Sequence, residues 1–373
     1  MQSDASQAGA AVRFAGKNWS LAAYWHIARR RLARKHSENL KSVAAKSWDI
    51  APRETTPAPP AFFLPNQWER VTGWEEKLFF PYEHPRRTME GLGSMEQHPT
   101  RGYLIKDVLM IDGTLYKDGA SFWLSSTRPR WLPRISVERE VDRGAVYCSP
   151  YGNRWFGTWL AEDCLTYALA RDEGLPVTIA PSARYPLYPQ MLDYEAWLDM
   201  QPTRLHSAFF RELVLFDDFG HNSHQHLRYR AMGEKLLAHV NYQAHPGVFI
   251  LRGETGDLRL LVNEMEIAEH LRKHRGFRIL DPTKSDLPTI VATCAGARVV
   301  VGVEGSQLVH GVNVLPPGSA VLALQPPNRF VCFYKYLTDR DHQHFGFVVG
   351  TPEGEGFRID LEEVERTLDL FPT

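Results

Sequence analysis

Short apolar runs alternate with longer amphipathic stretches along the chain from residue 151 onward. The apolar runs are typical of buried strands and occupy residues 176–182, 212–216, 248–253, 277–282, 297–303 and 319–324. Helical periodicity marks the stretches between and after them, at residues 155–174, 191–200, 226–240, 263–276, 286–296, 306–312 and 360–371. Strands that alternate with helices predict parallel α/β sheets. The four strands within residues 248–324 therefore predict one half of a two-domain α/β protein.

The first 150 residues follow a different pattern. Residues 1–16 are mostly small or polar, which predicts disorder, and residues 18–46 are rich in Ala, Leu, Arg and Lys, which predicts a helix. Residues 51–66 are rich in proline and predict a linker. Residues 101–147 consist of short apolar runs separated by turns, and Asp112-Gly113 marks a hairpin. We therefore expect an antiparallel lead-in to the first α/β domain.

These patterns divide the chain into four parts. Residues 1–60 form an extension with a basic helix and the Pro-rich linker, and residues 61–225 form an N-terminal α/β domain. Residues 226–350 form a C-terminal α/β domain, and residues 351–373 form a helix that packs back on the N-terminal domain. The predicted architecture is a pair of Rossmann-like α/β domains with an antiparallel N-terminal lead-in.

Composition narrows the classes of function. The 373 residues are 43% hydrophobic and 23% charged, with a formal net charge of −1, so no overall positive charge favours nucleic acid. The four cysteines form no Cys-x-x-Cys pair, which argues against a zinc site and for a reducing compartment. No apolar run approaches a membrane span, and no signal-peptide core follows the N-terminus. We expect a cytoplasmic protein.

The predicted basic helix leaves two interpretations open. Its basic and aromatic residues are Trp19, Tyr24, Trp25, Arg29, Arg30, Arg31, Arg34 and Lys35. An amphipathic basic helix can lie on anionic lipid, which would place the protein weakly at the inner face of the membrane. The alternative is a solvated helix that packs on the body of the protein through its aromatic residues.

Candidate chemistry lies where predicted buried strands end. The apolar strand 297–303 runs into Glu304-Gly305-Ser306-Gln307, and the strand 248–251 runs into Arg252. Ligands of parallel sheets bind beyond the carboxyl ends of the strands. The arginine fork suits phosphate oxygens, and a glycine before a helix start lets backbone N–H groups approach an anion. The sequence predicts an anion site here, against the simpler interpretations of a surface arginine and an ordinary turn with a serine cap.

Two stretches resemble glycosyltransferase family 61. That family has a strand ending in arginine, a second arginine, an Asn-Glu pair opening a helix, and a later strand leading into His-Gly-Ala-Gly-Leu. Arg252, Arg259, Asn263 and Glu264 match the first elements, and Leu315-Pro316-Pro317-Gly318-Ser319 also fits. The last element matches in part, because Glu304 stands at the histidine and Ser306-Gln307 replace Ala-Gly.

The upstream stretch 152–165 is similar to the family's Asn-x-x-His-Trp-Leu-x-Asp pattern. Thr158 stands at the histidine, and Glu162 stands at the aspartate with Asp163 beside it. The likeness covers residues 101–330 and implies a GT-B-like fold and inverting, metal-independent transfer from a nucleotide sugar, with UDP as the expected nucleotide. A glycan or another hydroxyl compound would be the acceptor, bound on the side of the N-terminal domain, and the protein would act in polysaccharide biosynthesis without a cofactor.

The resemblance and the strand-end argument together assign roles to residues. The expected donor-binding residues are Arg252, Arg259, Asn263, Glu264, Gly305, Ser306, Gln307 and His310. The catalytic base that deprotonates the acceptor would be one of Glu162, Asp163 and Glu304. Simpler interpretations remain for several of them: Asn263 as a helix cap, Glu162 and Asp163 as solvated helix carboxylates, and Glu304 as a strut for an arginine.

Three other features bear on the class of function. The histidines of the stretch "GHNSHQH" and the pair Asp217-Asp218 invite a metal site, but their spacing does not favour one, and we expect no metal. No Gly-x-Ser-x-Gly motif supports an α/β hydrolase. The substitutions at Thr158 and Glu304 leave a second function open, that of an inactive nucleotide- or sugar-binding homologue in a polysaccharide assembly complex.

Overall fold

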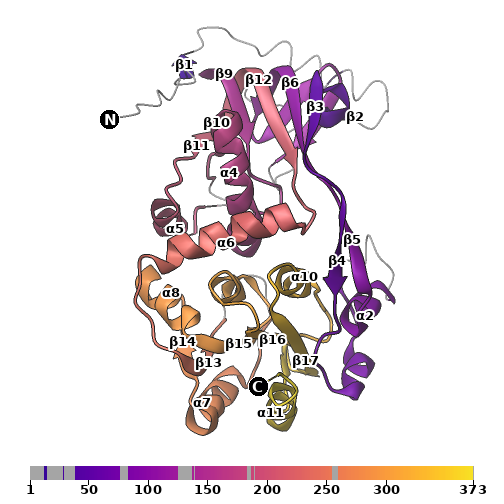
Figure 1. Cartoon of the computed structure of the whole chain (residues 1–373), viewed down its shortest axis with the longest axis vertical. Coiled ribbons are helices and arrows are strands. Elements are labelled where there is room, and N and C mark those ends of the chain that lie inside the picture. Colours follow the sequence, from indigo (N-terminus) through magenta and orange to yellow (C-terminus); the bar gives the residue numbers. More distant parts are fainter. Residues whose placement is uncertain are drawn as a thin grey trace. The chain divides into compact units, whose positions relative to one another are not determined.

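The chain divides into two units, each assembled from two separate stretches of sequence. Unit 1 holds residues 1–52 and 99–219, and unit 2 holds residues 53–98 and 220–373. Both appear in the computed structural model, which describes residues 12–14, 28, 38–75, 83–124, 137, 139–182, 186–188, 190–253 and 259–372. Each unit combines helices with strands, so the fold is mixed α/β (Figure 1).

Unit 1 is built on a ten-stranded mixed sheet in the order β11-β10-β9-β12-β6-β7-β8-β2, with β1 paired to β9 and β3 paired to β6. The strands are β1 (Val12–Phe14), β2 (Glu38–Asn39), β3 (Lys46–Ala51), β6 (Thr100–Ile111), β7 (Thr114–Lys117), β8 (Ala120–Trp123), β9 (Arg139–Val146), β10 (Leu175–Ile179), β11 (Thr203–Leu205) and β12 (Ser207–Asp217). Strand β9 is parallel to β10 and β12, whereas β12 is antiparallel to β6. The carboxyl ends of β9, β10 and β12 therefore meet at one edge of the sheet.

Helices flank that edge of unit 1. A helical segment runs from α3 (Phe156–Thr158) through a π-helical turn (Trp159–Asp163) into α4 (Cys164–Glu173), and α5 (Met191–Trp197) follows β10. The core beneath them contains Val141, Val177 and Phe210, all fully buried. Between β6 and β7 the predicted hairpin is present: Asp112 and Gly113 both have positive φ, at 45° and 75°, as a tight turn between twisted strands requires.

Unit 2 is built on a five-stranded sheet in the order β14-β13-β15-β16-β17, in which all the pairs are parallel. The strands are β13 (His245–Ile250), β14 (Arg278–Leu280), β15 (Ala297–Val303), β16 (Ala320–Gln325) and β17 (His344–Val349). Strand β16 is buried along its whole length. This agrees with the predicted unbroken apolar runs, because a parallel sheet covered on both faces offers no polar face.

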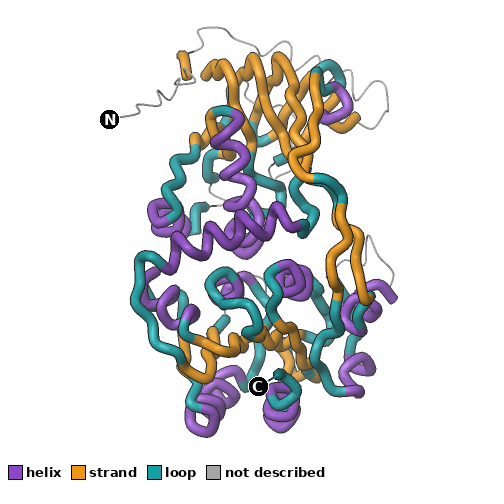
Figure 2. Tube along the Cα trace, in the orientation of Figure 1, coloured by secondary structure: helices purple, strands orange, loops and turns teal. Residues whose placement is uncertain are grey.

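Helices cover both faces of the unit 2 sheet, as Figure 2 shows. They are α6 (Ser223–Leu237), α7 (Glu264–Arg275), α8 (Leu287–Ala295), the short α9 (Val309–Val312), α10 (Phe333–Arg340) and α11 (Leu361–Leu368). All but α10 were predicted, as were β13 to β16. Strand β17 and α10 were not predicted.

Several predictions about the N-terminal part are wrong. The helix predicted at 18–46 is wrong at its C-terminal end, because residues 38–46 form β2, a 3-10 turn (Leu40–Val43) and the start of β3. Residue 28 is helical, and the other residues of that stretch lie outside the described part of the chain. Residues 12–14, expected to be disordered, pair with β9. Propensity favoured a helix at 38–46, but cross-strand pairing with β6 and β8 prevails.

The predicted Pro-rich linker is also structured. Strand β4 (Glu54–Ala58) pairs antiparallel with β5 (Gly93–Gln97), and a 3-10 helix (Pro65–Arg70) follows, all within unit 2. The chain leaves unit 1 after residue 52, contributes residues 53–98 to unit 2 and returns to unit 1 at residue 99. The observed division therefore differs from the predicted domain boundaries. The C-terminal helix α11 packs in the core of unit 2 through Val364 and Leu368. Its Glu363 pairs with Arg70, a residue of the predicted N-terminal domain that belongs to unit 2 in the structure.

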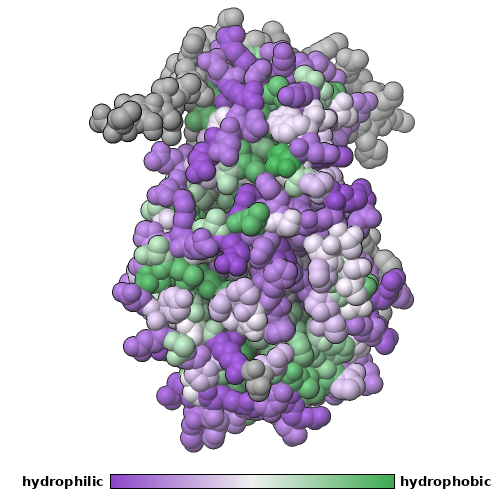
Figure 3. All heavy atoms as spheres, in the orientation of Figure 1, coloured by the Kyte–Doolittle hydropathy of each residue, from purple (hydrophilic) through white to green (hydrophobic). Residues whose placement is uncertain are grey.

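Among the described residues no helix is both long enough and apolar enough to cross a bilayer. The face drawn in Figure 3 is mostly hydrophilic, with apolar side chains in separate patches.

Candidate active site

Arg252 lies at the carboxyl end of β13 and is held there by a half-buried carboxylate. Glu264, in the first turn of α7, accepts hydrogen bonds from the backbone N–H of Arg252 at 2.7 Å and of Gly253 at 3.0 Å. These bonds fix the turn after the strand, and Arg252 is only 8% exposed. Burial raises the pKa of Glu264, while the two N–H groups counteract that shift. Glu264 thus positions the backbone of Arg252.

Gly305 provides the space that the Arg252 side chain occupies. A Cβ at residue 305 would lie 1.8 Å from Nη1 of Arg252 and 2.6 Å from Oε1 of Gln307. The same guanidinium nitrogen donates to Gln307 Oε1 at 3.3 Å. The glycine is therefore required for close approach of an arginine to the backbone. From the sequence we expect this glycine to admit an anion directly, and the structure gives the space to Arg252 instead.

Arg259 is surrounded by charge. Its Nη1 donates to the backbone oxygen of Glu304 at 2.8 Å and forms an ion pair with the Glu304 carboxylate, and its Nη2 lies 4.0 Å from Glu75. Its Nε is buried and has no hydrogen-bond partner among the described residues. Arg329 pairs with the other oxygen of Glu75 at 2.6 Å. The Glu304 carboxylate and backbone oxygen thus both contact Arg259.

Three guanidinium groups converge at this place, and we name Arg252, Arg259 and Arg329 the arginine cluster. Burial, reinforced by the charges of Arg329 and Arg252, lowers the pKa of Arg259 to about 10. Arg259 and Arg329 share the carboxylate of Glu75, and Arg252 lies against Gly305, next to Glu304. Arg259 stays protonated near pH 7, so the cluster keeps three cations at one strand-end edge. Such an arrangement suits a polyanion with several oxygens, which arginine forks bind in pairs.

Two members of this arrangement, Glu75 and Arg329, were not predicted. The stretch 72–75 runs beside 327–330, with hydrogen bonds from Phe330 N to Gly73 O at 2.9 Å and from Glu75 N to Phe330 O at 3.0 Å. A Cβ at Gly73 would lie 2.4 Å from Asn328 O, so the two stretches touch. Backbone pairing between loops so far apart in sequence leaves no periodic signal. The only sign of this pairing in the sequence is that a glycine directly precedes Trp74 and Glu75.

Other predicted donor residues have structural partners. The Asn263 amide donates to Ile359 O at 2.8 Å and accepts from Ile359 N at 3.2 Å, so it joins α7 to the segment before α11. His310 is 3% exposed, and burial lowers its pKa to about 3, so its ring is neutral. Ser306 and Gln307 belong to a 3-10 turn, followed by the single turn of α9. So short a helix has little macrodipole, and its N-terminus attracts an anion only weakly.

In unit 1 the predicted Glu162 and Asp163 lie together at the carboxyl ends of β9 and β12. They line a cavity of about 30 Å³ with Ser149, Thr166 and Asp218, which we name the carboxyl pocket. From the sequence Asp218 was a candidate only for a metal ligand, and here it accepts hydrogen bonds from Thr100 Oγ1 at 3.0 Å and Thr166 Oγ1 at 2.8 Å. A cavity of this size holds a water-sized group.

The two adjacent carboxyl groups differ in environment. Asp163 is 3% exposed and accepts a hydrogen bond from Ser149 N at 2.9 Å, whereas Glu162 is half-buried. Burial, with a contribution from the charge of Glu162, raises the pKa of Asp163 well above its ordinary value and favours the neutral acid. Both residues end a π-helical turn, and such turns are frequent at functional sites. Of the pair, Glu162 is the better placed to take a proton from a ligand.

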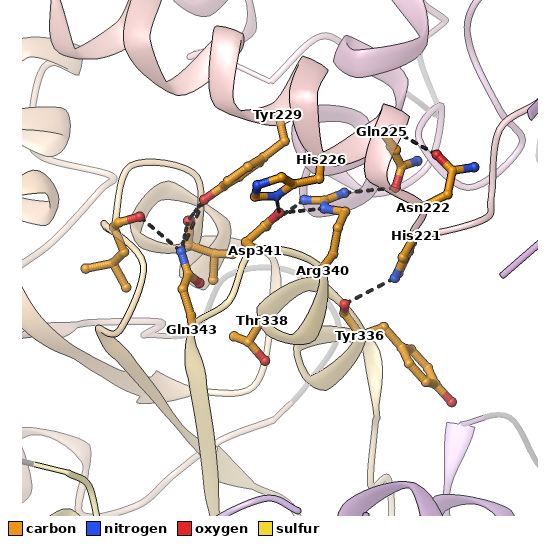
Figure 4. A network of polar contacts seen from close by, with 12 residues as sticks. His221, Asn222, Gln225, His226, Tyr229, Tyr336, Thr338, Arg340, Asp341 and Gln343 are labelled. Atoms are coloured by element: carbon orange, nitrogen blue, oxygen red, sulfur yellow. Dashed lines mark hydrogen bonds and ion pairs between the residues drawn. The ribbon is translucent and has the colours of Figure 1, made fainter. Parts of the chain in front are cut away.

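The histidines considered as metal ligands have separate partners in unit 2. His221 Nδ1 lies 3.2 Å from Tyr336 O, His224 contacts Arg228, and His226 Nδ1 lies 3.5 Å from Asp341 Oδ1. Figure 4 shows His221 and His226 directed at different groups. Asp341 is itself buried in a bidentate pair with Arg340 at 2.8 Å. These residues join α6 to α10, and within the described residues no group of three or more His, Cys, Asp or Glu side chains could hold a metal.

The comparison with known families agrees with the resemblance drawn from the motifs. The comparison with curated proteins finds no match. The chain matches the family described as Glycosyltransferase 61 over residues 63–322, a stretch that contains Glu162, Arg252, Arg259 and Glu304. Arg329 lies beyond it. Because the match covers well over half of the sequence, the chain belongs to glycosyltransferase family 61.

Proposed function

We propose that this glycosyltransferase transfers a sugar from a nucleotide-sugar donor to a hydroxyl acceptor, with the donor diphosphate bound by the arginine cluster. The observation that carries the proposal is the convergence of three arginines: Arg259 and Arg329 share the carboxylate of Glu75, and Arg252 lies against Gly305, next to the Glu304 that Arg259 contacts. Holding like cations together costs free energy, which a diphosphate with its several oxygens offsets on binding. UDP is the nucleotide we expect from the family resemblance.

Transfer needs a base as well as a leaving-group site. We assign the base to Glu162, which takes the proton of the acceptor hydroxyl as the hydroxyl oxygen bonds to the anomeric carbon and the bond to the diphosphate breaks. Attack opposite the leaving group inverts the anomeric centre. The arginines stabilise the negative charge that accumulates on the diphosphate. In this proposal unit 2 carries the donor and unit 1 the acceptor, as in a GT-B arrangement.

Glu304 is the rival base, but its carboxylate is committed to Arg259. A Glu304→Gln variant separates the two roles. If Glu304 is only a strut, the variant keeps transfer within the range of the wild type once donor binding is saturated. If transfer is abolished while the donor still binds, Glu304 is the base and the assignment to Glu162 is wrong.

The arginine cluster supports metal-independent donor binding, because fixed cations take the place of a divalent ion at the diphosphate. Calorimetric titration of the full chain with UDP, with and without EDTA, tests this. We expect the same affinity in both titrations. A requirement for added magnesium or manganese would refute the metal-free assignment.

An inactive homologue that only binds nucleotide or sugar is the second candidate, favoured by the Glu304–Arg259 pair at the position where the family has a histidine. Incubation with a panel of nucleotide sugars distinguishes the two. Release of nucleoside diphosphate, by hydrolysis or transfer, supports the enzyme. Binding of the donor without release supports the inactive homologue.

A further inference from the structure

Exposed aromatic side chains gather in unit 1 on the segment that leads to Glu162. Tyr151 is 48% exposed and Tyr188 is 38% exposed, although large aromatic side chains usually bury most of their surface. Both lie beyond the carboxyl ends of parallel strands, Tyr151 after β9 and Tyr188 after β10. With Trp155 they form what we name the aromatic platform.

The platform is held rigid by its own contacts. Tyr151 and Trp155 stack with ring centroids 5.7 Å apart and an angle of 7° between the planes, and the Arg154 guanidinium lies 4.7 Å from the Trp155 ring centroid. The Tyr188 hydroxyl donates to Arg154 O at 2.7 Å, and its ring meets Phe156 edge to face at 5.6 Å. Rings held in this way lose little entropy when a ligand binds. The stability of the fold does not require exposed aromatic rings to be fixed by such stacking and hydrogen bonds.

The platform is continuous with the carboxyl pocket. Gly152, next to Tyr151, donates to Ser149 Oγ at 2.9 Å, and Ser149 N donates to Asp163 at 2.9 Å. A Cβ at Gly152 would lie 1.9 Å from Asp163 Oδ2, so this turn packs directly on the residue beside Glu162. The turn that carries Tyr151 therefore packs against the residue that follows the proposed base in the sequence.

A second cavity adjoins the platform and supplies polar groups. It has a volume of about 40 Å³ and is lined in part by Tyr188, Thr178 and the ion pair of Arg204 with Glu195 at 2.5 Å. Flat aromatic faces bordered by hydroxyl and charged groups suit a ligand with a C–H face and a hydroxyl rim. A sugar ring has both. A lipid chain would need a long apolar groove, and the charged groups of Arg154 and Arg204 interrupt this surface.

We infer that the aromatic platform binds a sugar ring of the acceptor, so that the acceptor is a carbohydrate whose ring stacks on Tyr151 and whose neighbouring hydroxyl reaches Glu162. The inference rests on the proposed function for the role of acceptor. The binding of carbohydrate itself does not depend on turnover.

The kinetic test compares Tyr151→Ala and Tyr151→Phe with Tyr242→Ala, a matched control in unit 2 whose side chain is 49% exposed. We expect Tyr151→Ala to raise the acceptor KM roughly 2- to 13-fold, the range for one aromatic contact. Tyr151→Phe and Tyr242→Ala should keep the wild-type KM. Donor hydrolysis without acceptor should stay unchanged in Tyr242→Ala. An unchanged acceptor KM in Tyr151→Ala would overturn the inference.

A binding test separates this inference from the proposed function. Saturation-transfer NMR on the full chain uses cellotetraose, maltotetraose and mannotetraose as probes, each at millimolar concentration and without donor. Binding to the wild type and to Tyr242→Ala, with loss in Tyr151→Ala, supports the platform even if no nucleotide sugar is turned over. Equal binding to all variants, or binding of none of the three probes to the wild type, counts against it.

Discussion

In unit 2 three arginines lie close enough for their charges to lower the pKa of Arg259, whereas in unit 1 three carboxyl groups line one small cavity. The carboxylates of Glu75 and Glu304 brace the arginines but do not balance all three positive charges, so the cluster stays cationic. In the carboxyl pocket, uncharged donors hold the two aspartates: the backbone N–H of Ser149 binds Asp163, and threonine hydroxyls bind Asp218. Burial there raises the pKa of Asp163 and so reduces the charge of the pocket.

The difference matches two chemical tasks. A leaving diphosphate needs charge that is fixed before the reaction and does not depend on pH, and arginine supplies it. An acceptor hydroxyl needs a group that can gain a proton, which a carboxylate can do and a guanidinium cannot. The roles of the two regions can therefore be tested by single substitutions, each of which affects only one region.

The largest effect is expected from Glu162→Gln. Glutamine keeps the size of the side chain but cannot take a proton, so we expect transfer to fall about 10²- to 10⁴-fold, the usual contribution of a general base. UDP affinity, which depends on unit 2, should stay at the wild-type value in calorimetry. If the variant transfers sugar at a rate within a few-fold of the wild type, Glu162 is not the base. The two regions would then not divide the chemical tasks as proposed.

The next largest effect is expected from Arg252→Ala. Loss of one charge-assisted contact to a phosphate costs roughly 1.5–3 kcal/mol, or about 10- to 150-fold in UDP affinity. Arg298→Ala is the matched control, since Arg298 is an exposed arginine at the opposite end of β15. We expect that control to bind UDP normally. If both variants bind UDP equally well, the cluster is not the diphosphate site.

The two regions also differ in how far the sequence predicts them. Strands β13 to β16 carry unbroken apolar runs, so the apolar pattern alone places Arg252 and Glu304 at strand ends. It cannot place Glu75 and Arg329, because they meet through backbone pairing between loops far apart in the chain. In unit 1 the sequence points to both Glu162 and Asp163 but does not rank them. The ranking depends on burial and on the Ser149 hydrogen bond, which involve residues distant in sequence.

A smaller effect on UDP affinity, again through the arginine cluster of unit 2, is expected from Gly305→Ala. The added methyl group would lie 1.8 Å from Nη1 of Arg252, so the guanidinium must move away from Gln307. Its charge remains in the site, and we therefore expect UDP affinity to fall by less than in Arg252→Ala, about 10-fold at most. Transfer at saturating donor should be nearly normal. The comparison with Gly318→Ala, where the Cβ has open space but φ is +81°, separates the contact with Arg252 from the backbone strain of replacing a glycine.

The smallest effect on transfer is expected from Asp163→Asn, because asparagine resembles the neutral acid that burial favours and can still accept the hydrogen bond from Ser149 N. Its effect on stability should depend on pH. In the unfolded chain an aspartate titrates near pH 4, whereas the folded pKa is raised well above that, so the folded state holds a proton that the unfolded state has released. The wild type therefore loses stability as pH rises from about 4 to the folded pKa, and asparagine, which does not titrate, removes this loss. Urea unfolding of both proteins between pH 4 and pH 8 should show a difference that grows in favour of the variant. If the difference in the free energy of unfolding between the two proteins does not change with pH, Asp163 is charged in the folded protein. The carboxyl pocket would then not be partly neutral, and its contrast with the cationic arginine cluster would be wrong.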